Sequence, residues 1–358
     1  MKKLLLGIAA VCLAGFTFAQ DAPLWMRHSV ISPDGTTIAF TYKGDIYTVP
    51  VAGGRAMQIT TNPAYDTAPV WSPDSKRIAF ASDRMGSLDV YIVAKDGGEP
   101  RRLTTHSGSE TPLAFTDAGH VLFSAGIMPS AEAVVFPSNG QFNQVYRVSV
   151  EGGRPTMISS MPMECISINK EGAMLYQDKK GYEDYWRKHH VSPIARDIWM
   201  YTPGKEPQYR QLTTFGGEDR EPVWAPDGKT FYYLSEENGS FNIYRRTPGD
   251  AKAVQLTHYT KNPVRYLSAA TDGRLCYGFD GEIYTLLPGG EAQKVNISIV
   301  SDRNDKDIIR QIKSSGATEM AVSPDGKEVA FVLRGDVYVT SVEYKTTKQI
   351  TNTPCQER

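Results

Sequence analysis

The chain contains 358 residues, of which 41% are hydrophobic and 22% charged, and its formal net charge is −1. This composition is globular, rich in the glycine and proline of turns, and it excludes a disordered or collagenous chain. The small net charge, without long runs of one sign, argues against nucleic acid and anionic membrane surfaces as partners.

Residues 1–19 have the pattern of a secretory signal peptide. Two lysines precede an apolar stretch from Leu4 to Phe16, and Ala19 stands before a plausible cleavage site. The apolar stretch is too short for a stable membrane span, so we expect none after cleavage. The sequence therefore predicts export to the periplasm or cell envelope. Lipidation at Cys12 is a weaker alternative, because the residues before it fit a lipidation box badly.

Three cysteines remain after cleavage, namely Cys165, Cys276 and Cys355. An odd number, spread over distant segments, does not predict a disulfide framework. Cys165 and Cys276 stand in apolar stretches and are expected to be small buried hydrophobes. Cysteine pairs at ligand spacing are absent, so we predict no metal site and no cofactor.

A short hairpin recurs along the chain, and its best copy lies in the repeat from Pro69 to Thr104. Ser72-Pro73-Asp74 has the residues of a tight turn, which Gly closes in sister copies. The next strand alternates, with Ile78 and Phe80 on one face. Two further strands follow, separated by turns. Four short antiparallel strands in about 40 residues are typical of one propeller blade.

Six copies of this repeat precede residue 300, and the third and fourth contain long insertions. Their recognisable segments begin at Ser32, Ser72, Phe115, Ile168, Ala225 and Ala270. A fixed repeat of this kind indicates a closed or stacked repeat fold. The sequence thus predicts an all-β fold, with a six-bladed β-propeller of four-stranded antiparallel blades over residues 20–299.

The pattern then changes. Residues 300–318 are polar and charged and are expected to be a linker. Residues 319–358 contain a seventh copy, which we expect to be the first blade of a second, incomplete propeller. A single blade leaves a sheet face and an edge uncovered. The sequence therefore reads as a fragment or a truncated reading frame.

The blade motif resembles that of TolB and other "WD40-like" envelope propellers, and the arrangement more closely resembles the amino-terminal region of tricorn-type proteases. The most specific segment is "GYEDYWRKHHVSPIARDIWMY", residues 181–201. The tricorn resemblance implies a six-bladed propeller, a seven-bladed propeller, a PDZ module and a serine peptidase core. This chain would then be the non-catalytic region that gates or binds peptides or unfolded polypeptide, in a protein that is homo-oligomeric at full length.

Two alternatives stay open. A TolB-like envelope propeller would act as a protein–protein interaction module and belong to no enzyme. The propeller of a prolyl-oligopeptidase-type enzyme is disfavoured, because the segment after six repeats leads to another blade.

The resemblance does not transfer catalytic residues. The catalytic Ser and His of the family fall beyond this chain, and no G-x-S-x-G elbow is present. The family places a pair of arginines after the second blade, but residues 105–120 contain none. Arg101-Arg102 lies just before, in the fourth strand, and is not assigned that role. We predict no catalytic residue.

The candidate peptide-binding residues lie in the fourth-blade insertion. They form a cationic and aromatic group: Trp186, Arg187, Lys188, His189, His190 and Arg196. Such a group would attract a peptide or a carboxylate. The competing interpretation is a solvated, partly packed loop over the rim. A metal site is disfavoured, because adjacent histidines point to opposite sides of an extended chain.

The remaining polar motifs have structural explanations. The recurring aspartates, among them Asp34 and Asp227, are accounted for by their turns rather than by cation binding. Asp83-Arg84 follows a strand and is expected to be a surface ion pair of little energetic value.

Overall fold

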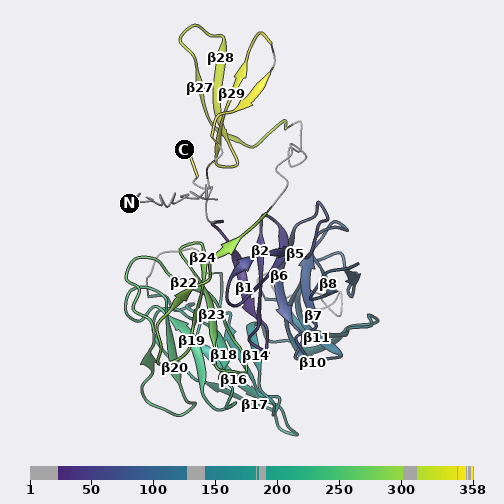
Figure 1. The fold of residues 1–358 in the computed structure, drawn as a ribbon, viewed down its shortest axis with the longest axis vertical. Helices are drawn as coiled ribbons and strands as arrows, with labels where there is room; N and C mark the ends of the chain where they lie inside the picture. The colour runs from purple at the N-terminus through teal and green to yellow at the C-terminus, as the bar shows by residue number, and fades with distance from the viewer. Residues whose placement is uncertain are drawn as a thin grey trace, which may run out of the picture. The chain divides into compact units, whose positions relative to one another are not determined.

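The computed structural model describes residues 23–126, 142–182, 184, 191–300, 313–344, 346–351, 353 and 356–357. These residues form β-strands joined by turns and loops, and no α-helix occurs among them. Accordingly, this part of the chain offers no helix long and apolar enough to cross a membrane. The chain divides into two compact units, residues 1–300 and 301–358, which Figure 1 draws.

The described part of the first unit contains six four-stranded antiparallel sheets, here called sheets 1 to 6 in chain order. Within each sheet the strands lie side by side in chain order. Sheet 1 contains β1 (Arg27–Ile31), β2 (Thr37–Tyr42), β3 (Asp45–Pro50) and β5 (Met57–Gln58). Sheet 2 contains β6 (Asp66–Trp71), β7 (Arg77–Ser82), β8 (Asp89–Ala94) and β9 (Arg101–Arg102). Sheet 3 contains β10 (Glu110–Asp117), β11 (His120–Ala125), β12 (Gln144–Ser149) and β13 (Thr156–Ser159). Sheet 4 contains β14 (Met163–Ile168), β15 (Met174–Asp178), β16 (Ile198–Thr202) and β17 (Gln208–Gln211). Sheet 5 contains β18 (Asp219–Trp224), β19 (Phe231–Ser235), β20 (Asn242–Arg246) and β21 (Val254–Gln255). Sheet 6 contains β22 (Val264–Ala269), β23 (Leu275–Phe279), β24 (Glu282–Leu286) and β25 (Gln293–Lys294).

The first strand of each sheet packs against the first strand of the next. The chain of contacts runs from β1 through β6, β10, β14 and β18 to β22, and β22 contacts β1 again (Figure 1). The first strands thus form a closed circle with the other strands outside it. This is the arrangement of a β-propeller, and it confirms the all-β prediction.

The hydrophobic core is divided among the junctions between neighbouring sheets. Each of six buried clusters combines residues of two adjacent sheets, the last one joining sheet 6 to sheet 1. The cluster of sheets 1 and 2, for example, includes Ile46, Trp71 and Phe80. Each sheet therefore buries both of its faces, and removing one would expose the faces of two others.

The repeated turn has the hydrogen bonds expected from its sequence. The Ser72 hydroxyl donates to Asp74 Oδ1 at 2.5 Å and accepts the backbone N–H of Arg77 at 2.9 Å. Asp74 also accepts the N–H of Lys76 at 3.2 Å. The hydrogen bond from Ser72 is the main cause of a lowered pKa at Asp74. The turn explanation of this aspartate is confirmed.

The same turns also join neighbouring sheets. The backbone N–H of Asp34 donates to Ser75 Oγ in the next turn at 3.1 Å. On the other side, Thr271 in sheet 6 donates its N–H and its hydroxyl to the carbonyl of Pro33, at 2.9 and 2.7 Å. The turns of sheets 6, 1 and 2 are therefore linked in series by hydrogen bonds.

In five of the described sheets, a threonine that follows the fourth strand is hydrogen-bonded to the third strand. Its hydroxyl accepts the N–H of a residue at the start of the third strand, the first residue in β16 and the second in the other sheets. These bonds are 2.8–2.9 Å long and occur in Thr60–Ile46, Thr104–Val90, Thr213–Ile198, Thr257–Ile243 and Thr351–Val337. The Leu-Thr or Ile-Thr pairs of the repeat thus fix the short outer strand, which alone has few backbone bonds.

A short parallel pair joins the end of the first unit to sheet 1. Strand β26 (Ile297–Ser298) lies beside β4 (Gly54–Arg55). Gly54 N–H donates to the Asn296 carbonyl at 2.8 Å, and Ala56 N–H donates to that of Ser298 at 2.9 Å. A Cβ on Gly53 would lie 2.5 Å from the Asn296 oxygen, so only glycine fits there.

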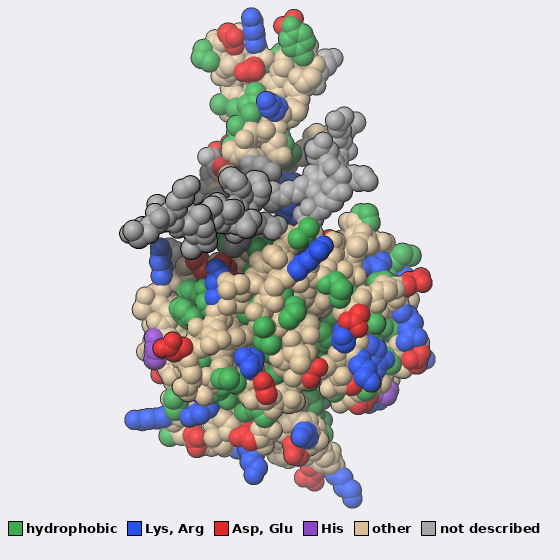
Figure 2. All heavy atoms as spheres, in the orientation of Figure 1, with side chains coloured by type: hydrophobic (Ala, Val, Ile, Leu, Met, Phe, Trp, Pro, Cys, Tyr) green, Lys and Arg blue, Asp and Glu red, His purple; other side chains and the backbone are tan. Residues whose placement is uncertain are grey.

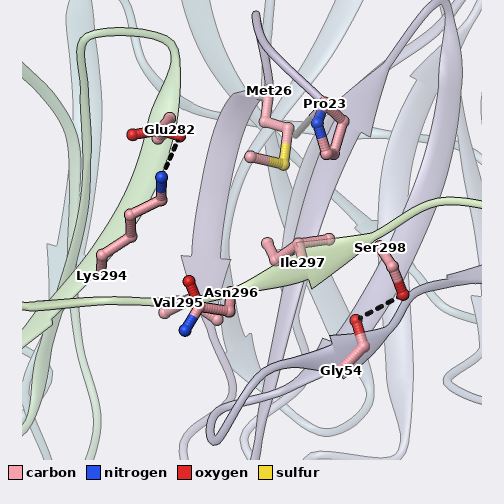
Figure 3. A pocket seen from close by; sticks show the side chains of 9 residues that line it. All are labelled: Pro23, Met26, Gly54, Glu282, Lys294, Val295, Asn296, Ile297 and Ser298. Carbon is pink, nitrogen blue, oxygen red and sulfur yellow. Dashed lines mark hydrogen bonds and ion pairs between the residues drawn. The ribbon is translucent and has the colours of Figure 1, made fainter. Parts of the chain in front are cut away.

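Figure 3 shows this closure and the small pocket beside it. Ile297 is buried between the two chain segments, while the Glu282–Lys294 ion pair spans the outer strands of sheet 6. The pocket is lined by residues of the closure itself, among them Gly54, Ile297 and Ser298.

The second unit contains one four-stranded sheet, with β27 (Ala317–Val322), β28 (Glu328–Leu333), β29 (Asp336–Ser341) and β30 (Thr347–Gln349). All six residues of β27 are exposed, Met320 to 75%. Val332 is the buried hydrophobic residue of the described part of this unit. The sheet thus has the blade pattern without a covered face, and such a sheet has little stability of its own.

Candidate functional site

The circle of first strands is the candidate functional site, because each of these strands carries a β-bulge. In five of them a residue other than glycine takes a positive φ at the bulge, and these are His28, Ala68, Cys165, Glu221 and Tyr266. A bulge breaks the alternation of a strand and re-aims its side chains. Polar and ionisable groups are thereby gathered around the inner strands.

One arc of the circle is aromatic. The rings of His28 on β1 and Tyr266 on β22 lie 5.0 Å apart, and His28 Nδ1 lies 3.1 Å from Thr67 Oγ1 on β6. Burial, with a smaller contribution from the charge of Arg27, lowers the pKa of His28 to about 4. Burial raises the pKa of Tyr266 to about 12. At neutral pH this arc therefore presents uncharged hydrogen-bonding rings.

The opposite arc, between sheets 4 and 5, holds a buried ionic network. Arg196 contacts Glu164 at 3.1 Å and Glu218 at 3.3 Å, and Arg220 contacts Glu218 at 2.5 Å. Arg220 also lies 5.2 Å from the ring centroid of Phe241. Such a network is costly to break, since removing one partner leaves an uncompensated buried charge.

The charges within this network are matched. Burial would raise the pKa of Glu164, but the nearby charges of Arg196 and Lys179 lower it overall. Glu221 extends the contacts to sheet 6 by accepting the N–H of Leu267 at 2.8 Å. The arc is therefore well adapted to hold three sheets in register.

Of the six predicted peptide-binding residues, the structure describes Arg196, which is 5% exposed and paired as above. Trp186, Arg187, Lys188, His189 and His190 lie outside the described residues. Their grouping with Arg196 stays a prediction.

The prediction that Cys165 is a buried hydrophobe is wrong, since its side chain is exposed, whereas Cys276 is buried as expected. The bulge of β14 gives Cys165 a φ of +51° and takes it out of the strand alternation. Arg84 also differs from expectation. It pairs with the buried Asp66 at 3.0 Å rather than with Asp83 at the surface.

The inner-strand residues were missed because they look unremarkable in the sequence. The available signal was the position of the bulge residues, each of which stands four residues before the repeated turn segment. Within the described ranges, no group of three or more His, Cys, Asp or Glu residues could hold a metal ion. Figure 2 shows acidic and basic side chains interspersed over the face of the first unit in view.

Comparison with known families decides the relationship. The family model of the "Tricorn protease N-terminal beta propeller domain" matches residues 23–292. The chain belongs to the tricorn protease N-terminal propeller family. This match covers the strands from β1 to β24, including the whole circle of inner strands.

Curated tricorn relatives agree. Tricorn protease homolog 1 of Streptomyces coelicolor is 26% identical over 289 residues, which is 79% of this chain and 26% of the relative. Tricorn protease of Thermoplasma acidophilum is 25% identical over 333 residues, 89% of this chain and 29% of the relative. The chain thus spans less than a third of the length of these relatives.

A solved structure supports the same fold. The crystal structure of the tricorn protease matches with a TM-score of 0.68 and 19% identity, over 92% of this chain and 32% of that one. The expected resemblance to the amino-terminal region of tricorn-type proteases is therefore confirmed.

Proposed function

We propose that this chain is the non-catalytic propeller region of an exported tricorn-type serine peptidase. It would gate or bind peptides or unfolded polypeptide for a catalytic core outside this chain. The family match over residues 23–292 carries the proposal. The match covers 26% and 29% of the two curated relatives, which leaves most of their length for a separate core. At full length the protein would be a homo-oligomer.

The architecture fits this role. The six sheets of the first unit would be the six blades of one propeller, supported by the closed circle of their first strands. The sheet of β27 to β30 would be the first blade of a second propeller. The full exposure of β27 supports this, because four of the six residues of β6 are buried and only one of the five residues of β1 is exposed.

The inner strands offer chemistry suited to a peptide. His28 and Tyr266 supply uncharged rings, and the charges of Arg27 and Arg265 lie close enough to Tyr266 to oppose the rise of its pKa. Rings and guanidinium groups bind extended backbone and carboxylate ends with little sequence preference. In this proposal the aromatic and basic residues 186–190 add to the same attraction.

The binding proposal is tested by fluorescence anisotropy with a labelled, unstructured peptide of about 15 residues. We expect saturable binding that weakens about ten-fold or more when Trp186, Arg187 and Lys188 are replaced by serine. Replacement of the exposed Lys205 in another turn of sheet 4 is the matched control and should leave binding unchanged. Binding of a folded partner but not of unstructured peptides would favour the alternative, a TolB-like interaction module.

Export to the periplasm or cell envelope is the second part of the proposal. It rests on the signal pattern of residues 1–19. Expression in a bacterial host, followed by intact-mass measurement of the periplasmic fraction, should find a chain beginning at Gln20. Retention of the full mass in the cytoplasm would contradict export.

A further inference from the structure

Three buried carboxyl groups lie together at the junction of sheets 2 and 3. Asp66, Asp89 and Glu110 are the first residues of β6, β8 and β10, and their exposed fractions are 0%, 0% and 1%. Strand β10 packs against β6, β7 and β8, which brings these strand starts to one end of the junction. Buried carboxylates normally need a cationic or hydrogen-bonding partner.

Two arginines form ion pairs with two of these three carboxyl groups. Arg84 Nη2 donates to both oxygens of Asp66, at 3.1 and 3.0 Å, and its guanidinium lies 4.5 Å from the ring centroid of Tyr91. Arg102 Nη2 lies 2.8 Å from Asp89 Oδ2. With Asp66 and Asp89 each facing an arginine, Glu110 is the third carboxyl for two cations.

The polar atoms around Glu110 are poorly satisfied. Both of its side-chain oxygens, both of those of Asp89 and Arg102 Nε lack a well-aligned hydrogen bond among the described residues. The Thr104 hydroxyl and the His106 backbone N–H lie near the Glu110 carboxyl and favour its charged form in part. Burial and the negative charge of Asp89 act in the other direction and raise the pKa of Glu110 to about 7.

An internal comparison explains why Glu110 differs from Asp66. Asp66 pairs with Ser82 across β6 and β7, and Arg84 follows two residues later. In sheet 3, Glu110 pairs with Ala125, and the residue two positions later is Ile127. Isoleucine carries no charge. The acid that begins the first strand therefore has an arginine at this position of the repeat in sheet 2 but not in sheet 3.

Sheet 5 repeats this situation independently. Asp219, the first residue of β18, pairs with Ser235, and Glu237 occupies the position of Arg84. Burial, with Asp197 and Glu237 nearby, raises the pKa of Asp219 to about 7, although Ser235 and Thr213 hydrogen-bond to it. Two junctions of the circle thus bury a strand-start acid that lacks its arginine.

We propose that Glu110 is a proton-operated switch of the propeller. It is protonated at mildly acidic pH, and loss of its proton places a third negative charge against two arginines and loosens the junction of sheets 2 and 3. The groups facing it are Asp89 on β8 and Arg102 on β9, with Asp66, Arg84 and Tyr91 beside them. The result is a ring that is tighter in acidic than in basic surroundings.

The direction in which stability changes with pH follows from proton binding by Glu110. Because the folded state holds this proton more tightly than the unfolded state, stability is greatest below the ordinary carboxyl range and falls as pH rises to about 7. In that window the unfolding equilibrium constant grows by up to about ten-fold per pH unit, and above it the contribution is constant.

The test compares wild type, Glu110→Gln and Glu99→Gln by urea unfolding between pH 5 and 8.5. Glu99 is exposed and serves as the matched control. We expect wild type and the control to lose stability with rising pH. Over the same pH range, the unfolding equilibrium constant of Glu110→Gln should increase by a factor about ten-fold or more smaller than that of wild type. Equal pH dependence in all three proteins would overturn the proposal.

A second measurement needs no variant. Carbon-13 NMR of the glutamate side-chain carboxyls in the wild-type chain should contain one resonance that titrates near neutral pH. Faster amide exchange in β10 than in β22 on raising the pH from 6 to 8, after correction for the intrinsic exchange rate, should accompany it. A chain in which every glutamate carboxyl titrates below pH 6 would refute the switch, whatever the variant does.

Discussion

Arg84 provides the sharpest test of how the blades are joined. Its guanidinium donates to both oxygens of Asp66, which is fully buried, and packs over Tyr91. Replacement of Arg84 by methionine keeps much of the side-chain volume but leaves the Asp66 carboxylate without its cation. Loss of one partner of a buried ion pair costs about 3–5 kcal/mol.

The assay is chemical unfolding followed by tryptophan fluorescence. Arg84→Met should destabilise the first unit by about 3 kcal/mol or more, and Asp66→Asn in the same chain should restore more than half of that loss, because the uncompensated charge is gone. Arg245→Met, at an exposed position of β20, should change stability by about 0.5 kcal/mol or less.

A loss below about 1 kcal/mol in Arg84→Met would refute this reasoning and return the residue to the surface ion pair that the sequence indicated. Failure of Asp66→Asn to restore stability would mean that the contact with Tyr91, rather than the ion pair, accounts for the loss.

Three further predictions concern other parts of the circle. A chain ending at Val295 keeps β25 but lacks β26, and it should melt at a lower temperature and be cut faster by protease than a chain ending at Val300. Thr257→Val removes the acceptor for the Ile243 N–H and should cost about 1–3 kcal/mol by urea unfolding, whereas Thr214→Val at an exposed position should cost little. Because the pKa of His28 is lowered to about 4, its contribution to stability should be lost as pH falls from about 6.5 towards 4, and His28→Gln should flatten that part of the stability profile.

The fold was predictable because its determinants are local and repeated. The Ser-Pro-Asp turn, the alternating strand after it and the threonine of the outer strand each recur, and in sheet 2 they form the hydrogen bonds that their residue types require. Agreement among several copies makes such a pattern informative even where one copy, such as that beginning at Phe115, is degenerate.

The site was less predictable because its contacts join distant positions. Arg84 and Asp66 are 18 residues apart, and the β26–β4 closure joins positions more than 200 residues apart. The exposure of Cys165 follows from a bulge, which no alternation rule anticipates. Arg196 belongs to the basic segment singled out in the sequence, yet its ion pairs are with Glu164 in β14 and with Glu218, which precedes β18.

In the proposed function, this chain binds peptides without cleaving them. The most direct measurement incubates the purified chain with a labelled unstructured peptide and follows anisotropy and intact peptide mass in the same sample over several hours. We predict saturable binding with the peptide mass unchanged. Absence of binding, or cleavage that disappears when one serine of this chain is replaced by alanine, would contradict the claim.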